Sequence, residues 1–331
     1  MVQIMQPRIP VLVLAGFLGA GKTTLLNHLL HNDQGVRIGV LVNDFGAINV
    51  DALTVAGQVD ASVSLGNGCL CCAVDASGLD RMLERLTQAE LDLIVIEASG
   101  LAEPRELVQL VLSATHEEIE YGGLVEVVDA AEFESTCDRH PELERHLAFA
   151  DLVVLNKIDR VSAEQVTRIR ELAGKLSGGR PVLPVAYGRI DLRLLLDPVE
   201  RPRPAVEQLS FDELLDHDGH LHAEYQTVSF ETPEVLHPRK FLRLLDERPE
   251  GLYRAKGTVH FGVRERYTLH TVGRYLRFER GEWPGEPRTQ LVLIGTGLDE
   301  EALRAGLAAC VEPDPESIDD NAMLRVLHHS S

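Results

Sequence analysis

A glycine-rich stretch near the start of the chain has the residue types needed to bind phosphate. Residues 16–23 read GFLGAGKT and match the pattern G-x-x-x-x-G-K-[S/T] at every fixed position, between an apolar run and a helix-forming segment. The glycines allow backbone N–H groups to approach phosphate oxygens, and the positive end of the following helix faces the anion. The sequence therefore predicts a nucleoside triphosphate site. The alternative is a glycine-rich turn with an incidental lysine.

Two side chains of this loop are catalytic candidates. Lys22 is expected to reach the terminal phosphates, and the Thr23 hydroxyl is expected to ligate Mg²⁺. The residues of the loop that we expect to contact the nucleotide are Gly19, Ala20, Gly21, Lys22, Thr23 and Thr24.

Two further segments are expected to meet the phosphates at the ends of strands. The apolar run 91–96 predicts a central parallel strand that ends at Glu97, which is the candidate acid for holding Mg²⁺ and the third catalytic candidate. Gly100 can offer its N–H to the terminal phosphate. Asp44 follows the buried strand 36–42 and is a candidate for cation contact in a mobile loop, with a simple turn as the alternative.

The tetrad Asn156, Lys157, Ile158 and Asp159 follows another apolar strand and identifies the base. A carboxylate accepts hydrogen bonds from both the N1–H and the exocyclic amine of guanine, whereas adenine presents an acceptor at N1 and has no 2-amino group. Asn156 and Lys157 are expected to brace the ring and the loop. The predicted nucleotide is therefore GTP with Mg²⁺.

Three of the five cysteines, Cys69, Cys71 and Cys72, form a C-x-C-C cluster after a Gly-Asn-Gly turn. Thiolates bind ions such as Zn²⁺, and this clustering favours a transition-metal site for Zn²⁺ or Co²⁺ over structural disulfides. A buried set of small side chains is the alternative. A second group, His217, His220 and His222, has the residue types to collect a divalent ion weakly, and a hydrated linker is its alternative.

Composition limits the setting in which this chemistry occurs. At 331 residues with 44% apolar content, the chain can bury a full core, and no apolar run reaches the length of a membrane span. We expect a cytoplasmic protein without a signal peptide. The 52 acidic and 32 basic residues give a net charge of −20, which argues against nucleic acid and anionic membranes as partners.

The spacing of strands and helices predicts two domains. Residues 8–197 are expected to form a P-loop GTPase domain of the α/β class, with a mostly parallel sheet and helices on both faces. Residues 198–223 form a proline-rich, histidine-containing linker. Residues 224–312 are expected to form a smaller α+β domain with an antiparallel sheet and helices on one side, followed by a flexible tail, 313–331.

Taken together, these motifs resemble those of the CobW-type metal-linked GTPases, relatives of UreG and HypB. The resemblance rests on residues 16–23, 43–46, 68–72, 97–104 and 156–159, and it extends to 254–257 and 291–295 of the second domain. It implies a GTP-dependent metallochaperone or insertase that delivers Zn²⁺, Co²⁺ or a similar ion to a client metalloprotein or metallocofactor-assembly enzyme, with a nucleotide-dependent homodimer as a candidate assembly. The chain departs from the family pattern near Ala186, where a serine is often found, and its histidine insert is short.

Two other functions fit part of the same pattern. A P-loop kinase or synthetase of a small metabolite would use the phosphate loop but not the cysteines as a metal site. A metal buffer or sensor would bind the ion without transferring it. Under the carrier hypothesis, GTP and metal affinities are coupled, and hydrolysis is slow because the sequence contains no identifiable arginine finger or water-positioning residue.

Overall fold

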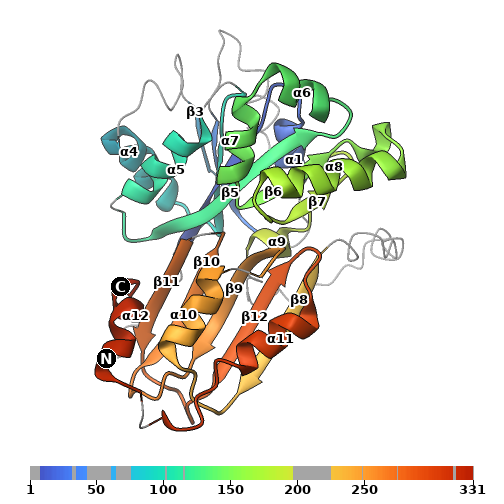
Figure 1. The fold of residues 1–331 in the computed structure, drawn as a ribbon. Coiled ribbons are helices and arrows are strands. Elements are labelled where there is room, and N and C mark those ends of the chain that lie inside the picture. Colours follow the sequence, from blue (N-terminus) through green and yellow to red (C-terminus); the bar gives the residue numbers. More distant parts are fainter. Residues whose placement is uncertain are drawn as a thin grey trace, which may run out of the picture. The chain divides into compact units, whose positions relative to one another are not determined.

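The computed structural model describes residues 8–31, 35–42, 61–64, 76–100, 103–114, 116–196, 225–247, 249–273, 275–315 and 318–330. The chain divides into two compact units, of which the second contains residues 179–182 and 225–331. Figure 1 traces both units along the sequence. Each unit is built on its own β-sheet.

The first unit contains a seven-stranded sheet with the order β3-β2-β4-β1-β5-β6-β7. Its strands are β1 (Ile9–Ala15), β2 (Ile38–Val42), β3 (Ala61–Ser64), β4 (Leu93–Glu97), β5 (Ile119–Asp129), β6 (Leu152–Asn156) and β7 (Val182–Pro184). Strand β1 pairs in parallel with β4 on one side and β5 on the other. Strands β4 and β6 are buried along their whole length, as expected of strands covered on both faces. The predicted α/β class is confirmed.

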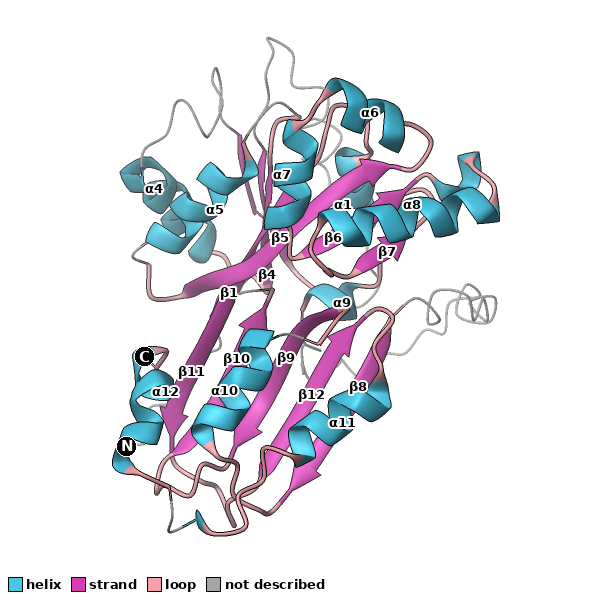
Figure 2. Cartoon of the chain, in the orientation of Figure 1, coloured by secondary structure: helices cyan, strands magenta, loops and turns pink. Residues whose placement is uncertain are grey.

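Helices cover both faces of this sheet (Figure 2). They are α1 (Lys22–Leu30), α4 (Ala76–Thr87), α5 (Pro104–Ser113), α6 (Phe133–Arg139), α7 (Glu142–Phe149), the 3-10 turn η1 (Ile158–Arg160), α8 (Ala163–Leu176) and α9 (Leu192–Leu195). Helix α8 begins with a capping box in which Ser162 and Gln165 bond each other's backbone N–H groups. Helix α5 begins at Pro104, whose missing N–H is no loss at a first helical position. A Ser-x-x-Gln pattern and a proline at the first helical position are both sequence signals for a helix start.

The second unit contains an antiparallel five-stranded sheet with the order β11-β10-β9-β12-β8. Its elements are β8 (Gln226–Thr232), α10 (Pro238–Glu247), β9 (Leu252–Val259), β10 (Arg266–Val272), β11 (Tyr275–Gly281), β12 (Thr289–Gly295), α11 (Glu300–Ala308), η5 (Asp320–Met323) and α12 (Leu324–His328). Helices α10, α11 and α12 lie on one face of this sheet (Figure 1) and enclose an apolar core with it. The predicted α+β architecture is confirmed.

The end of the chain differs from the sequence expectation. Residues 313–331 were expected to form a flexible tail, but η5 and α12 are folded, and Val326 is fully buried in the core of the second unit. Ser330 forms a β-bridge with Phe278 of β11. Helix α12 has five residues, and so short a helix gives no periodic pattern that would separate it from a loose tail.

Several sequence predictions fall outside the described residues. These are the roles of Asp44, of the cluster Cys69, Cys71 and Cys72, and of His217, His220 and His222, together with the linker 198–223. Among the described helices, none combines the length and the apolar character that crossing a membrane would require.

Candidate functional site

The glycine-rich loop joins β1 to α1, as its motif predicted, and places Lys22 at the first helical position. Gly21 has a φ of 105°, and a Cβ built on it would lie 2.2 Å from Nδ2 of Asn156. Only glycine meets both requirements at this position. The Lys22 ammonium group is buried and donates to the carbonyl oxygens of Gly16 at 2.7 Å and Phe17 at 3.3 Å. The lysine is thus held at the loop in which a phosphate would be bound.

A hydroxyl and a carboxylate meet beside this loop. Thr23 Oγ1 donates to Glu97 Oε1 at 2.9 Å. The pairing of Leu14 with Glu97 across β1 and β4 brings the two elements to the same edge of the sheet. Oxygen ligands of this kind fit Mg²⁺, which binds through one or two protein oxygens in addition to water and phosphate. A Cβ built on Gly100 would lie 2.8 Å from Leu18 N, so Gly100 also borders the loop.

The predicted base-binding tetrad lies at the end of β6. The Asn156 side chain is buried and joins two loops, since Nδ2 donates to the Ala20 carbonyl at 3.0 Å and Oδ1 accepts from Gly188 N at 2.9 Å. Lys157 Nζ donates to the Gly19 carbonyl at 2.5 Å. Asp159 lies in η1 and is exposed. The structure therefore brings the tetrad and the phosphate loop together, and it leaves the Asp159 side chain accessible.

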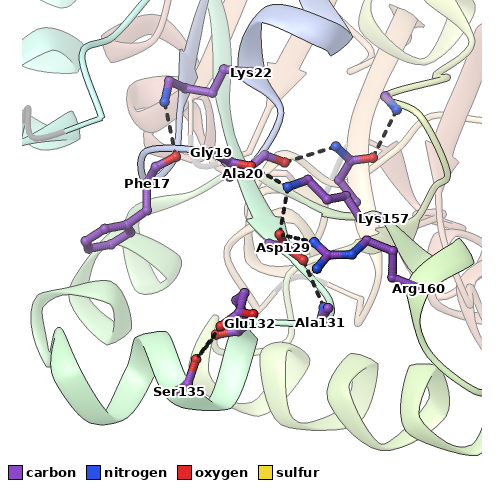
Figure 3. A network of polar contacts seen from close by, with 12 residues as sticks. Phe17, Gly19, Ala20, Lys22, Asp129, Ala131, Glu132, Ser135, Lys157 and Arg160 are labelled. Carbon is purple, nitrogen blue, oxygen red and sulfur yellow. Dashed lines mark hydrogen bonds and ion pairs between the residues drawn. The ribbon is translucent and has the colours of Figure 1, made fainter.

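Sequence reasoning missed an acidic residue that contacts the tetrad. Asp129, the last residue of β5, accepts from Lys157 Nζ at 2.7 Å and from Arg160 Nη1 at 3.2 Å, both at Oδ2 (Figure 3). Its Oδ1 accepts from the Ala131 backbone at 2.9 Å. An aspartate at a strand end usually forms a turn, so its type and position gave no specific signal in the sequence.

A second missed residue is Glu126, which lies inside β5 with none of its surface exposed. Neither carboxyl oxygen has a hydrogen-bond partner in the described part of the chain. Burial raises the pKa of Glu126 to about 8, the charge of Lys22 opposes this rise, and the charge of Glu103 adds to it. Glu103, at the start of α5, lies 3.5 Å from Nε2 of the buried His146. A neutral carboxyl group therefore lies near the phosphate-loop lysine.

A cavity of about 270 Å³ opens on the side of the loop next to α6. The loop residues Phe17 and Leu18, the Asp129 and Lys157 pair, and Arg139 of α6 contribute to its lining. Phe17 stacks against the His146 ring with 5.9 Å between the centroids. Lys157 therefore both lines the cavity and contacts the phosphate loop at Gly19.

The two cysteines that the structure describes, Cys137 and Cys310, are not placed to bind metal. Burial raises the pKa of both thiols, that of Cys310 to about 11. Within the described residues, no group of three histidine, cysteine or acidic side chains is placed to hold a metal ion. The predicted metal ligands of the C-x-C-C cluster lie outside the described residues.

Comparison with known families decides the relationship. Residues 10–184 match the family described as CobW/HypB/UreG, nucleotide-binding domain. The chain belongs to this family. Residues 225–311 match the C-terminal domain of the cobalamin synthesis protein CobW. The family match covers β1 to β7, which is the part of the chain that carries the phosphate loop and the tetrad. The resemblance inferred from the sequence is confirmed.

Two of the curated relatives of this CobW-family protein align along nearly its whole length, and a third aligns along about half of it. The zinc chaperone CobW of Pseudomonas aeruginosa is 32% identical and aligns with 89% of this chain and 90% of its own length. The zinc chaperone YjiA of Escherichia coli is 29% identical over 91% of this chain and 98% of its own length. The zinc-regulated GTPase metalloprotein activator 1 of Schizosaccharomyces pombe is 32% identical over 55% of this chain and 47% of its own length.

Proposed function

We propose that this protein is a GTP-hydrolysing metallochaperone that carries zinc and delivers it to a client metalloprotein. The enzyme class predicted from the sequence, a GTPase, agrees with the names of its relatives. Zinc is favoured over cobalt as the cargo because relatives aligned along nearly the whole chain are named zinc chaperones. The client is a protein with an empty zinc site. The absence of long apolar helices in the described residues is compatible with a cytoplasmic location.

One observation carries the nucleotide part of the proposal. Asn156 joins the phosphate loop at Ala20 to the loop at Gly188, so the phosphate-binding and base-reading segments form one assembly. In this assembly, Lys22 leaves its two carbonyl partners to bind the terminal phosphates, and Asp159 accepts from the guanine edge.

Three further residues, Thr23, Glu97 and Gly100, are assigned to the hydrolytic step. Thr23 and Glu97 would hold Mg²⁺, which neutralises the charge that develops on the transferred phosphoryl group. Gly100 would donate its N–H to the terminal phosphate. We expect slow hydrolysis in the isolated protein, since the sequence contains no identifiable arginine finger or water-positioning residue. A client or the metal would complete the site.

The cargo is assigned to the thiolates of Cys69, Cys71 and Cys72. Cys137 and Cys310 have raised thiol pKa values and remain protonated, which leaves the clustered cysteines as the thiolate donors. The cluster lies in the sequence between the strand that precedes Asp44 and the strand that ends at Glu97. Ordering of the segments around the phosphates would therefore change the grip of the thiolates on zinc.

The proposal is tested by calorimetric titration of the full chain with Zn²⁺, in the presence and absence of GTP and Mg²⁺. Because linkage is reciprocal, GTP should change zinc affinity by the factor with which zinc changes GTP affinity, about 5- to 150-fold for a typical coupling. A preference for ATP over GTP would favour the kinase alternative. Tight binding of both ligands without mutual influence would contradict the carrier mechanism.

Two variants separate the sites. Lys22→Ala should abolish nucleotide binding and leave zinc binding to the nucleotide-free protein unchanged, since Lys22 is a phosphate ligand in this assignment. Cys71→Ala should have the opposite effect. Transfer is measured as the activity of a zinc-dependent client mixed with the zinc-loaded protein. A client that becomes active only when GTP is bound to this protein would distinguish a chaperone from a metal buffer. Equal loss of GTP affinity in both variants would show that the site assignment is wrong.

A further inference from the structure

Asp129 connects the end of β5 to the turn formed by residues 157–160, which we call the base-reading turn because it contains Asp159. Its side chain is 12% exposed, and both carboxylate oxygens are engaged, Oδ1 with Ala131 N and Oδ2 with Lys157 and Arg160. Figure 3 shows the Lys157 and Arg160 side chains converging on it from the same turn. A carboxylate with three donors is fixed in position, and it can fix its partners in turn.

The two cations lie on either side of Asp159 in the chain. Lys157 precedes it with φ 62°, a left-handed conformation that non-glycine residues adopt only when their surroundings enforce it. Arg160 follows it at the end of η1. Lys157 Nζ also donates to the Gly19 carbonyl, so the turn is tied both to Asp129 and to the phosphate loop. These two contacts of Lys157 hold its backbone in the left-handed conformation.

Asp129 also affects the charge around the base-reading carboxylate. Lys157 and Arg160 are near neighbours of Asp159 in the sequence and are candidates to pair with it. Their contacts with Asp129, at 2.7 Å and 3.2 Å, direct both cations elsewhere. An Asp159 carboxylate that is not neutralised by its own neighbours remains available to accept two hydrogen bonds from guanine.

We infer that Asp129 is a positioning residue that determines guanine specificity by clamping Lys157 and Arg160 on both sides of Asp159. The inference rests on the proposed GTP site and adds a residue to it. Asp129 contacts neither base nor phosphate in this assignment and acts through the turn alone. Its loss should therefore impair the reading of the base and spare the hydrolytic step.

The test compares GTP with inosine triphosphate, which keeps N1–H but lacks the 2-amino group. In the full chain, Asp129→Asn removes the charge with little change of shape. GTP affinity should fall about tenfold, as expected when a charge-assisted bond is weakened. Inosine triphosphate affinity should fall only about threefold, so the ratio of the two affinities decreases. The kcat at saturating GTP should stay within about twofold of the wild type, so the change appears in KM.

Two further variants complete the experiment. Glu132→Gln is the matched control, because Glu132 lines the same cavity and bonds Ser135 without contacting the turn; it should leave the affinity ratio of the two nucleotides unchanged. Arg160→Gln changes an exposed residue and removes half of the clamp, so it should lower the ratio by a smaller factor. If Asp129→Asn does not fold, Arg160→Gln decides alone.

The outcomes separate this inference from the proposed function. If the wild-type protein prefers ATP, or does not distinguish GTP from inosine triphosphate, the assignment of the guanine site itself is wrong. A wild type that distinguishes them, together with folded Asp129→Asn and Arg160→Gln variants that keep the wild-type ratio, would overturn only the positioning role. An equal loss of affinity for both nucleotides would also overturn it.

Discussion

Glu126 places a carboxyl group between the apolar residues Val125 and Val127 of β5, near Lys22 of the phosphate loop and Glu103 at the N-cap of α5. Burial disfavours the carboxylate, and the pKa of about 8 means that the folded protein holds this group protonated at neutral pH. In the unfolded chain, the group ionises near its ordinary pKa of 4.5. Folding is therefore linked to proton uptake between these two values.

The first prediction is that Glu126 makes the protein less stable as the pH rises. The contribution of Glu126 to the free energy of unfolding is fully present below about pH 4.5 and is lost toward pH 8. The loss is about 1.4 kcal/mol per pH unit, because the folded state binds one more proton than the unfolded state. Urea unfolding between pH 5 and pH 8 measures it. The Glu126→Gln variant should lack this component of the slope, and equal slopes in both proteins would contradict the assigned pKa.

At the level of single residues, the sequence predicts the parts of the site whose chemistry needs a fixed pattern. Lys22, Thr23, Glu97 and Asn156 were assigned in this way, and the structure places them around one loop. Glu126 and Asp129 could not be found, since a lone acid inside or at the end of an apolar strand has no distinctive spacing. Their roles arise from which strand becomes the neighbour of β1, and a single sequence does not fix the strand order.

At the level of elements, the loop that follows β7 approaches the first helix closely. Gly188 has a φ of 68°, and a Cβ built on it would lie 2.7 Å from Leu25 N and 2.8 Å from Leu25 Cα. Its own N–H donates to Asn156 Oδ1. Any side chain at this position must move either the loop or α1, and the first turn of α1 carries Lys22 and Thr23.

The second prediction is that Gly188→Ala destabilises the first unit and weakens GTP binding. The left-handed backbone and the clash with α1 should together cost about 2 kcal/mol or more in the free energy of unfolding. Gly178→Ala is the matched control, because Gly178 has the same φ of 68° with no atom within 4 Å of the built Cβ. Urea unfolding and GTP titration of both variants measure the difference. Equal losses of stability would show that only the backbone conformation matters.

Periodic patterns in the sequence indicate some helices clearly and others not at all, as the comparison of α10 with α6 and α7 shows. Helix α10 spans Pro238–Glu247, where a proline marks its start and a strong apolar stripe runs along it, and both are sequence signals for a helix. Helices α6 and α7 were not predicted, since the segment between β5 and β6 is rich in charges and has few apolar residues per turn. Tertiary packing of Phe133, Leu143 and Leu147 stabilises them instead.

At the level of the whole molecule, the described residues assigned to the nucleotide belong to the first unit. They come from the ends of β1, β4 and β6, while the second unit has its own core around Phe241, Phe261 and Phe278. A ligand that binds only one folded unit stabilises that unit by mass action.

The third prediction is that GTP with Mg²⁺ raises the unfolding temperature of the first unit. The stabilisation should be about 2.7 kcal/mol at a free ligand concentration of 100 times Kd. Differential scanning calorimetry measures it. Leu303→Ala, in the core of the second unit, identifies the other transition by lowering it. A single transition that GTP and Leu303→Ala shift together would show that the two units unfold as one.

The contacts of Asn156 also set an order of events during synthesis. Its amide joins Ala20 to Gly188, so the link cannot close until residues up to 188 have left the ribosome, and the phosphate loop at 16–23 leaves it well before them. Nascent chains fold as domains become available, from the N-terminus onward. Firm retention of guanine nucleotide would therefore begin only after Gly188 has emerged, late in the synthesis of the first unit.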